Sequence, residues 1–181
     1  GNLRQFQACA DSPVFAELML TLSDRWYYGL LVGAGVTAIV QSSSATTGIL
    51  QGLARDGLIP LGLALPVLLG NNIGTTITAM LSSIGTSVNA RRAAMSHLLF
   101  NVIGALIFLP LLPLFTQVVR LTSPSITRQI ANAHTVFNVT NTLVLLPLSG
   151  LLAYTVTKLV PDDSREKKLS LQLDSRLLAT P

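Results

Sequence analysis

Four long stretches of the chain contain no charged residue. The ranges 26–54, 57–90, 93–119 and 129–157 hold no Asp, Glu, Lys or Arg. A helix of about 20 apolar residues is long enough to cross a bilayer. A helix of a soluble protein keeps charged side chains on its wet face, and these stretches have no such face. The pattern therefore predicts an all-α integral membrane protein.

The first of these stretches is interrupted by polar residues. Its middle holds a glutamine, three serines and two threonines: Gln41, Ser42, Ser43, Ser44, Thr46 and Thr47. A continuous helix would bury this cluster against lipid, so we predict a helix broken at 41–44, either as a re-entrant hairpin or as a discontinuous span. The alternative is an ordinary helix whose hydroxyls bond back to the preceding turn. Three consecutive serines beside a glutamine favour a binding site.

A second polar cluster lies in the next stretch, at 70–76. Its glycines, asparagines and threonines include Gly70, Asn71, Asn72, Thr75 and Thr76. Gly and Asn tolerate unusual dihedral angles, so we predict a second helix break, whose freed backbone groups could bind an ion or an anion. The alternative is a loop outside the membrane. The absence of charge as far as Arg91 favours a buried break.

Two later segments share a His-x-x-x-Asn pattern, at His97 and Asn101 and again at His134 and Asn138. Residues four apart share one face of a helix. A metal site would need further ligands, and no acidic residue occurs between Asp56 and Asp162. We therefore interpret both pairs as hydrogen-bonding groups that hold two spans against the rest of the bundle.

Composition and charge placement support the membrane assignment. Half of the 181 residues are hydrophobic, 11% are charged and the mean hydropathy is +0.58. The net charge of +4 comes from stretch boundaries and a basic tail, so no nucleic-acid surface is predicted. A single cysteine, Cys9, allows no internal disulfide. Pro110, Pro113 and Pro147 should kink or end the helices in which they lie.

We expect three parts along the chain. Residues 1–25 are predicted to include an amphipathic helix at the membrane interface, beginning near Asp11. Residues 26–160 are expected to form the membrane-embedded part, which contains the Gln-Ser-Ser-Ser run. Residues 161–181 form a tail or the start of a following helical domain, and its basic residues place it in the cytoplasm. The first residue is not Met, so we expect further segments on either side of the chain.

The two polar clusters together resemble the type II sodium/phosphate cotransporters and their bacterial relatives. The letters QSSSATT at 41–47 and GNNIGTT at 70–76 carry the resemblance, which continues through 91–94, 97–101 and 134–138 and covers roughly 26–160. It implies two related halves of inverted topology, each with one Gln-Ser-Ser-Ser hairpin. This chain has one such copy and is similar to the second half. We expect the other half in the same polypeptide or in another subunit.

The residues also indicate a mechanism. Phosphate is a hydrated anion, and these stretches offer no Lys or Arg to compensate its charge. The compensation should then come from coupling sodium ions, and the donors from hydroxyls, amides and helix ends. We predict that Gln41, Ser42, Ser43, Ser44, Thr46 and Thr47 bind phosphate. Gly70, Asn71, Asn72, Thr75 and Thr76 are candidates for binding sodium or for supporting the tip of the hairpin.

The sequence thus predicts a multi-pass membrane symporter with no catalytic residue and no resident cofactor. One alternative hypothesis is a transporter of the same fold that carries another oxyanion or a small carboxylate. A second is a noncatalytic membrane sensor or partner module. A serine hydrolase would need a serine paired with His97 or His134. The serine run lies outside a Gly-x-Ser-x-Gly elbow, which disfavours this third reading.

Overall fold

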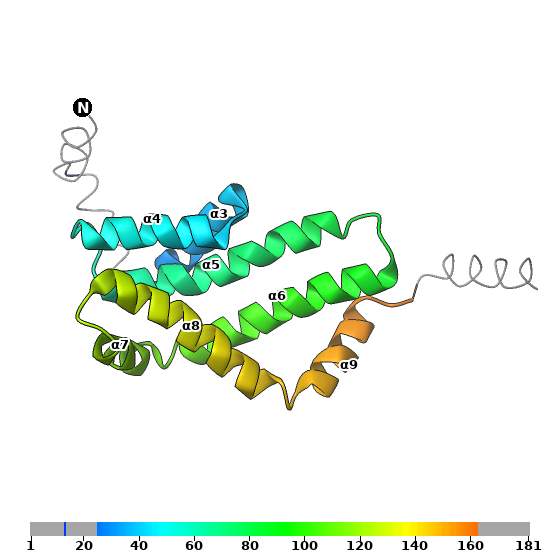
Figure 1. Ribbon diagram of the computed structural model, residues 1–181. Coiled ribbons are helices and arrows are strands. Elements are labelled where there is room, and N and C mark those ends of the chain that lie inside the picture. The colour runs from blue at the N-terminus through cyan, green and yellow to red at the C-terminus, as the bar shows by residue number, and fades with distance from the viewer. Residues whose placement is uncertain (1–12, 14–24, 163–181) are drawn as a thin grey trace, which may run out of the picture.

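The computed structural model describes residue 13 and residues 25–162, and every regular element in this part of the chain is an α-helix. Figure 1 shows their arrangement. We expected an interfacial helix within 11–24, and of this range only Pro13 is among the described residues. The tail beyond Asp162 also lies outside them. The helices are α3 (Trp26–Val40), α4 (Ser43–Arg55), α5 (Leu61–Ser82), α6 (Val88–Phe108), α7 (Leu112–Leu121), α8 (Ile126–Leu145) and α9 (Ser149–Leu159).

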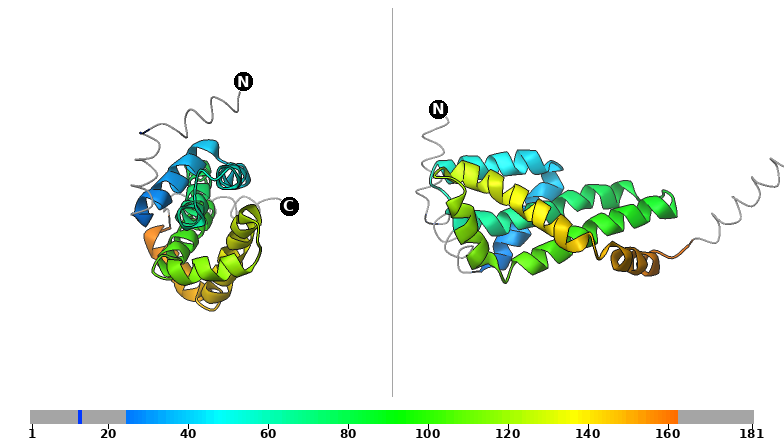
Figure 2. Two further views of the ribbon diagram at one scale, coloured as in Figure 1. Left: turned by 90° about the vertical axis from the view of Figure 1, so that its left-hand side faces the viewer. Right: turned by 60° about the horizontal axis from the view of Figure 1, so that its bottom comes forward.

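Helix α5 is the centre of the bundle. It contacts α3, α4, α6, α7 and α8. The views in Figure 2 show α3, α4, α6 and α8 arranged around α5. Helices α5 and α6 form an antiparallel pair joined by the loop 83–87 (Figure 1). Consequently the position of these five helices depends on their packing against α5.

Glycines allow α3 and α5 to pack with their backbones in contact. A Cβ atom on Gly33 would lie 2.0 Å from the Val67 carbonyl oxygen, and one on Gly70 would lie 1.9 Å from the Leu30 carbonyl oxygen. No side chain fits at such distances. Small residues spaced four apart let helices approach closely in membranes, where dispersion and polar contacts replace the hydrophobic effect. The glycines of the second polar cluster therefore serve the packing of α5 on α3.

The two predicted helix breaks have opposite outcomes. The first is present: α3 ends at Val40, Gln41 has a left-handed backbone with φ 56°, and α4 begins at Ser43. The second prediction was wrong, because α5 runs without interruption through 70–76. Its asparagine side chains find hydrogen-bond partners inside the bundle, and its glycines face the α3 backbone. No polar group is left to force the helix open.

The prolines end or bend helices as predicted. Helix α6 stops just before Pro110, and Pro113 lies in the first turn of α7, which turns away by 88°. Pro147 separates α8 from α9, which differ in direction by 86°. Of the helices described, α5 alone is long and apolar enough to span a membrane by itself. Counting each bent pair as one span raises the number to three.

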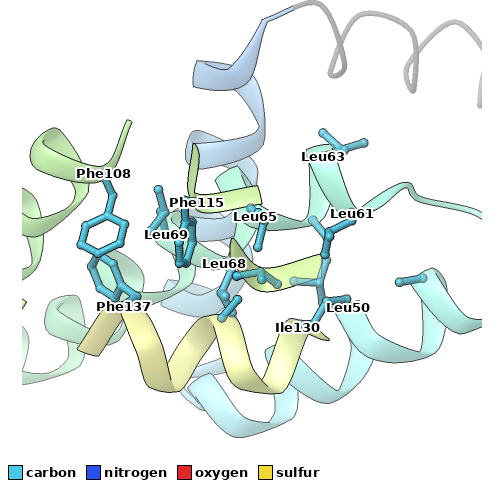
Figure 3. Close-up of a cluster of buried hydrophobic side chains, with 14 of the residues drawn as sticks. Leu50, Leu61, Leu63, Leu65, Leu68, Leu69, Phe108, Phe115, Ile130 and Phe137 are labelled. Atoms are coloured by element: carbon cyan, nitrogen blue, oxygen red, sulfur yellow. The ribbon is translucent and has the colours of Figure 1, made fainter. Parts of the chain in front are cut away.

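The apolar core lies where α4 to α8 meet, and Figure 3 shows its side chains. Phe108 packs edge-on against Phe115 and Phe137, with ring centroids 5.0 Å apart in both pairs. Large apolar side chains also cover the outside, including Ile39 at 84% and Leu121 at 89% exposure. An apolar outer surface of this kind suits a lipid environment.

The α3–α5 contact can be tested with two glycines of the same helix. Gly33→Ala should destabilise the protein by about 1–3 kcal/mol or more, because its methyl group meets the Val67 backbone. Gly35→Ala meets nothing within 4 Å and should be neutral or slightly stabilising, since Ala favours a helix by about 1 kcal/mol over Gly. Thermal unfolding of the purified protein in detergent measures both. Equal stability of the two variants would contradict the close packing.

Candidate functional site

A polar cavity of 260 Å³ lies between four helices of the bundle. Helices α4, α5, α6 and α8 each contribute to its wall. It is lined by Ser43, Asn72, Thr75, His97, Phe100, Asn101, His134 and Asn138. The cavity thus brings together one serine of the first polar cluster, two residues of the second and both His-Asn pairs.

The α4 end of the cavity is built by the helix break. Ser42 caps α4, because its hydroxyl oxygen accepts a hydrogen bond from the Ala45 backbone N–H at 3.2 Å. Ser43, the first residue of α4, lines the cavity. The first N–H groups of a helix have no acceptor within the helix, and the helix dipole adds partial positive charge there. The break therefore brings a helix end suited to an anion close to the cavity.

Asn71 holds this helix end in place. Its Oδ1 accepts a hydrogen bond from the Thr37 hydroxyl of α3 at 2.9 Å. Its Nδ2 donates to the Thr47 hydroxyl at 2.8 Å and to the Ser43 carbonyl at 3.2 Å, both on α4. The Asn71 side chain is fully buried. One amide on α5 thus fixes both helices that flank the break.

Asn72 connects α5 to α8 at the wall of the cavity. Its Oδ1 lies 3.2 Å from Nε2 of His134 and accepts this hydrogen bond when the imidazole carries its proton on Nε2. The same Oδ1 is 3.4 Å from Nδ2 of Asn138. Nδ2 of Asn72 donates to the Leu68 carbonyl of its own helix. The second His-Asn pair therefore binds across helices.

The first His-Asn pair lies on α6 and differs in its contacts. Asn101 is buried and donates to the His97 carbonyl at 3.0 Å, within its own helix. Asn138 makes the same local bond to the His134 carbonyl, at 2.8 Å. His97 is exposed on the described part of the chain and borders a neighbouring cavity as well. Both pairs thus share one local geometry, but an interhelical bond is described for the second pair alone.

Other predicted site residues lie away from the cavity. Gln41 and Ser44 are exposed on the described part of the chain. Thr46 and Thr76 are buried and donate to carbonyls of their own helices. Gly70 packs on the Leu30 backbone. Thr46, Thr47, Gly70 and Thr76 thus support the local fold around the cavity, and none of the residues in this group lines it.

Two buried polar residues near the site were not singled out from the sequence. Thr37 precedes the break by four residues, and its position as a lone hydroxyl in an apolar run was the available signal. Asn141 follows Asn138 by three residues and so shares its helix face. Its Nδ2 donates to the Phe100 carbonyl at 3.1 Å and ties α8 to α6 beside the cavity. A Cβ on Gly104 would collide with this amide.

The cavity is lined mainly by polar residues without a permanent charge. None of the lining residues is Lys, Arg, Asp or Glu. Among residue 13 and residues 25–162, no group of three or more His, Cys, Asp or Glu could hold a metal ion. His134 bonds an asparagine rather than a serine. Such an arrangement can bind a small ion through hydroxyl, amide and backbone groups.

A polar site at a broken helix inside an apolar all-helical bundle is typical of secondary transporters. The comparisons with known proteins agree with this class. A family model described as Na+/Pi-cotransporter matches residues 4–139. The chain belongs to the sodium/phosphate cotransporter family, whose members are membrane-embedded transporters and not enzymes.

Curated relatives match part of the chain. It is 37% identical to the uncharacterized protein YqeW of Bacillus subtilis over 115 residues, which are 64% of this chain and 38% of that protein. It is 45% identical to human sodium-dependent phosphate transport protein 2B over 89 residues, 47% of this chain and 13% of the relative. Mouse protein 2C is 41% identical over 45% of this chain and 14% of its own length. The matched part thus spans well under half of each relative, and no solved structure matches.

The Asn71 network predicts a specific loss of stability. Thr37→Val keeps the shape of the side chain and removes its hydroxyl, which leaves Asn71 Oδ1 buried without its donor. We expect a loss of about 1–3 kcal/mol in the free energy of unfolding. Thr135→Val is the control, because the exposed Thr135 hydroxyl bonds the carbonyl of Ala131 on its own helix. Denaturant unfolding in detergent compares them, and equal losses would contradict a central role of Asn71.

Proposed function

We propose that this chain forms one half of a symporter that carries inorganic phosphate across a membrane together with sodium ions. The observation that carries the proposal is the cavity that joins Ser43 of α4 to the asparagine, threonine and histidine side chains of α5, α6 and α8. Family membership supports the same cargo and coupling ion. The relatives' names describe those proteins, and the assignment to this chain is our inference.

The cavity wall has no permanent charge, and this explains why phosphate transport would be coupled to sodium. A phosphate ion that leaves water loses strong solvation, and its charge must be balanced in a low-dielectric site. The lining residues supply no Lys or Arg. A sodium ion bound beside the phosphate provides the missing positive charge, and the phosphate stabilises the sodium in return. Neither ion alone is expected to occupy the site strongly.

The geometry supports different roles for the residues of the two polar clusters. Ser43 and the N-terminal N–H groups of α4 suit the phosphate, because they are hydrogen-bond donors at the positive end of a helix. Oxygen atoms suit sodium, and Asn72 and Thr75, whose side chains carry oxygen, line the cavity. Asn71 has its amide fully engaged with Thr37, Thr47 and Ser43, so we assign it to holding α4 rather than to binding sodium.

The second half of the transporter would complete the site. Gln41 and Ser44 are exposed beside the helix break, where a partner hairpin could reach them. We therefore assign these two residues to the part of the phosphate site shared with a second Gln-Ser-Ser-Ser half. The apolar outer surface would face the lipid bilayer. The tail after Asp162 is assigned to the cytoplasm from its basic residues.

A direct test is phosphate uptake by the full-length protein that contains this chain. The purified protein is placed in proteoliposomes, and accumulation of radiolabelled phosphate is measured with an inward sodium gradient and again with potassium. We expect accumulation with sodium only. Inhibition of phosphate uptake by sulfate or by a small carboxylate shows whether the site also accepts these anions. Uptake that is equal in both salts, from folded protein, would contradict sodium coupling.

The cavity itself can be tested at Ser43. Ser43→Leu places a larger apolar side chain in the cavity wall and should abolish sodium-dependent uptake without preventing membrane insertion. Ser149→Leu makes the same change at the exposed first residue of α9, outside the cavity wall, and should keep most of the uptake. Insertion is checked by membrane fractionation and gel filtration. Normal uptake by Ser43→Leu would remove this cavity from the transport site.

Ser44→Leu tests whether a second half of the transporter contributes to the phosphate site. Ser44 is exposed here and does not line the cavity. If a second half meets α4 at this point, Ser44→Leu should also abolish uptake, although it leaves the cavity of this chain unfilled. Unchanged uptake in Ser44→Leu together with loss in Ser43→Leu would confine the phosphate site to the cavity described here.

A further inference from the structure

A second cavity lies at the far end of the α5–α6 pair, near the point where α9 ends. Its volume is 490 Å³. Figure 1 shows the end of α9 beside the start of α6 and the 83–87 loop, remote from the α3–α4 break. The cavity is lined by Met80, Ser83, Ile84, Arg91, Met95, Leu159, Val160, Pro161 and Asp162. Unlike the site described above, this cavity has charged residues in its wall.

Arg91 carries an unused donor at this cavity. Its Nε atom is buried and has no hydrogen-bond partner within the described residues. A buried N–H group without an acceptor costs about 1–3 kcal/mol, and more when the group is charged. The group belongs to a guanidinium that lines the cavity, so an anion bound there would give this incompletely paired side chain a counterion.

The neighbouring arginine is already paired. Arg92 donates from Nη2 to the Asp162 carboxylate and from Nε to the Val160 carbonyl, both at 3.0 Å. These bonds fasten the end of α9 to the start of α6 and form one side of the cavity. Asp162 is the one acidic residue in the wall, and its charge is compensated by Arg92. The positive charge of Arg91 is left without a counterion in this part of the structure.

The helix adds to the positive potential. Arg91 lies in the first turns of α6, a helix of 21 residues, near its N-terminus. Positive side chains at a helix N-terminus are unfavourable with respect to the helix dipole, whereas an anion there is favoured. An anion in the cavity would therefore compensate the charge of Arg91, which lines the wall, and relieve this unfavourable charge arrangement.

We propose that this second cavity binds a phosphate group, with Arg91 as its principal donor. A guanidinium matches the geometry of phosphate oxygens, and Arg is favoured for this purpose. The group could belong to an anionic lipid or to free phosphate. The methionine and aliphatic side chains of the wall offer apolar surface to the glycerol and acyl part of a lipid. The proposal concerns a site separate from the Ser43 cavity and does not rest on the transported cargo.

The test compares binding by the full-length protein and four variants in detergent. Arg91→Gln removes the charge and Nε. Arg128→Gln is the matched control, because Arg128 is exposed and does not line the cavity. Ile84→Glu adds a negative charge at an exposed wall position, 73% accessible, and leaves Arg91 in place. Ile84→Glu keeps the test valid if Arg91→Gln folds poorly. Ile84→Gln is its control, because it changes the same residue without adding a charge.

Two probes distinguish the sources of the phosphate group. In the lipid arm, native mass spectrometry measures binding of phosphatidylglycerol against diacylglycerol with the same chains. In the other arm, inorganic phosphate is titrated in potassium buffer. We expect Arg91→Gln to weaken one of these two interactions by about tenfold, the effect of losing one charge-assisted hydrogen bond. Ile84→Glu should weaken the same interaction, because its carboxylate repels the phosphate group.

Each outcome has a defined meaning. Weaker binding of phosphatidylglycerol with unchanged diacylglycerol identifies a lipid headgroup site, and weaker binding of inorganic phosphate identifies a site for the free anion. Arg128→Gln and Ile84→Gln should match the unmodified protein in both arms. If Arg91→Gln and Ile84→Glu bind both probes as well as their controls do, the cavity is not a phosphate site.

Discussion

The Asn71 amide is the interaction on which the geometry of the site depends. Its oxygen and nitrogen are bonded to Thr37 before the helix break and to Thr47 and Ser43 after it. Helix α3 comes within reach of Asn71 because Gly33 and Gly70 let the two backbones touch. In an apolar environment an unmet amide is costly, so satisfying it fixes the position of both helices. The end of α4 is thereby held at the cavity.

The two cavities to which we assign anions differ in the charge of their walls. The Ser43 cavity lies within the bundle and has no charged residue in its wall, which suits a site that must release what it binds. A fixed guanidinium at that depth would be costly without a permanent counterion. The Arg91 cavity lies at the end of the α5–α6 pair, where water can solvate part of the charge. An anion could stay bound at this proposed site, because the site does not have to release a transported substrate.

The sequence predicted some elements correctly for identifiable reasons. The break at Gln41 and Ser42 follows from local chemistry, since a serine cap and a left-handed residue end one helix and begin the next. The bends after α6 and α8 follow from proline, which cannot continue a helix. The predicted break at 70–76 was wrong, because Gly and Asn disfavour a helix only while their backbone and side-chain groups lack other partners. Neighbouring helices supply these partners.

By itself, the sequence determined the class of protein, the family, the break at 41–42 and the bends at the prolines. These properties depend on composition and on residues close together along the chain. Tertiary structure alone decided which polar residues share a cavity. Asn71 and Asn72 are adjacent, yet a helix points neighbouring side chains in different directions, so one faces α3 and α4 while the other faces α8. Only the packing of α5 against its neighbours distinguishes the residue that supports the site from the residue that lines it.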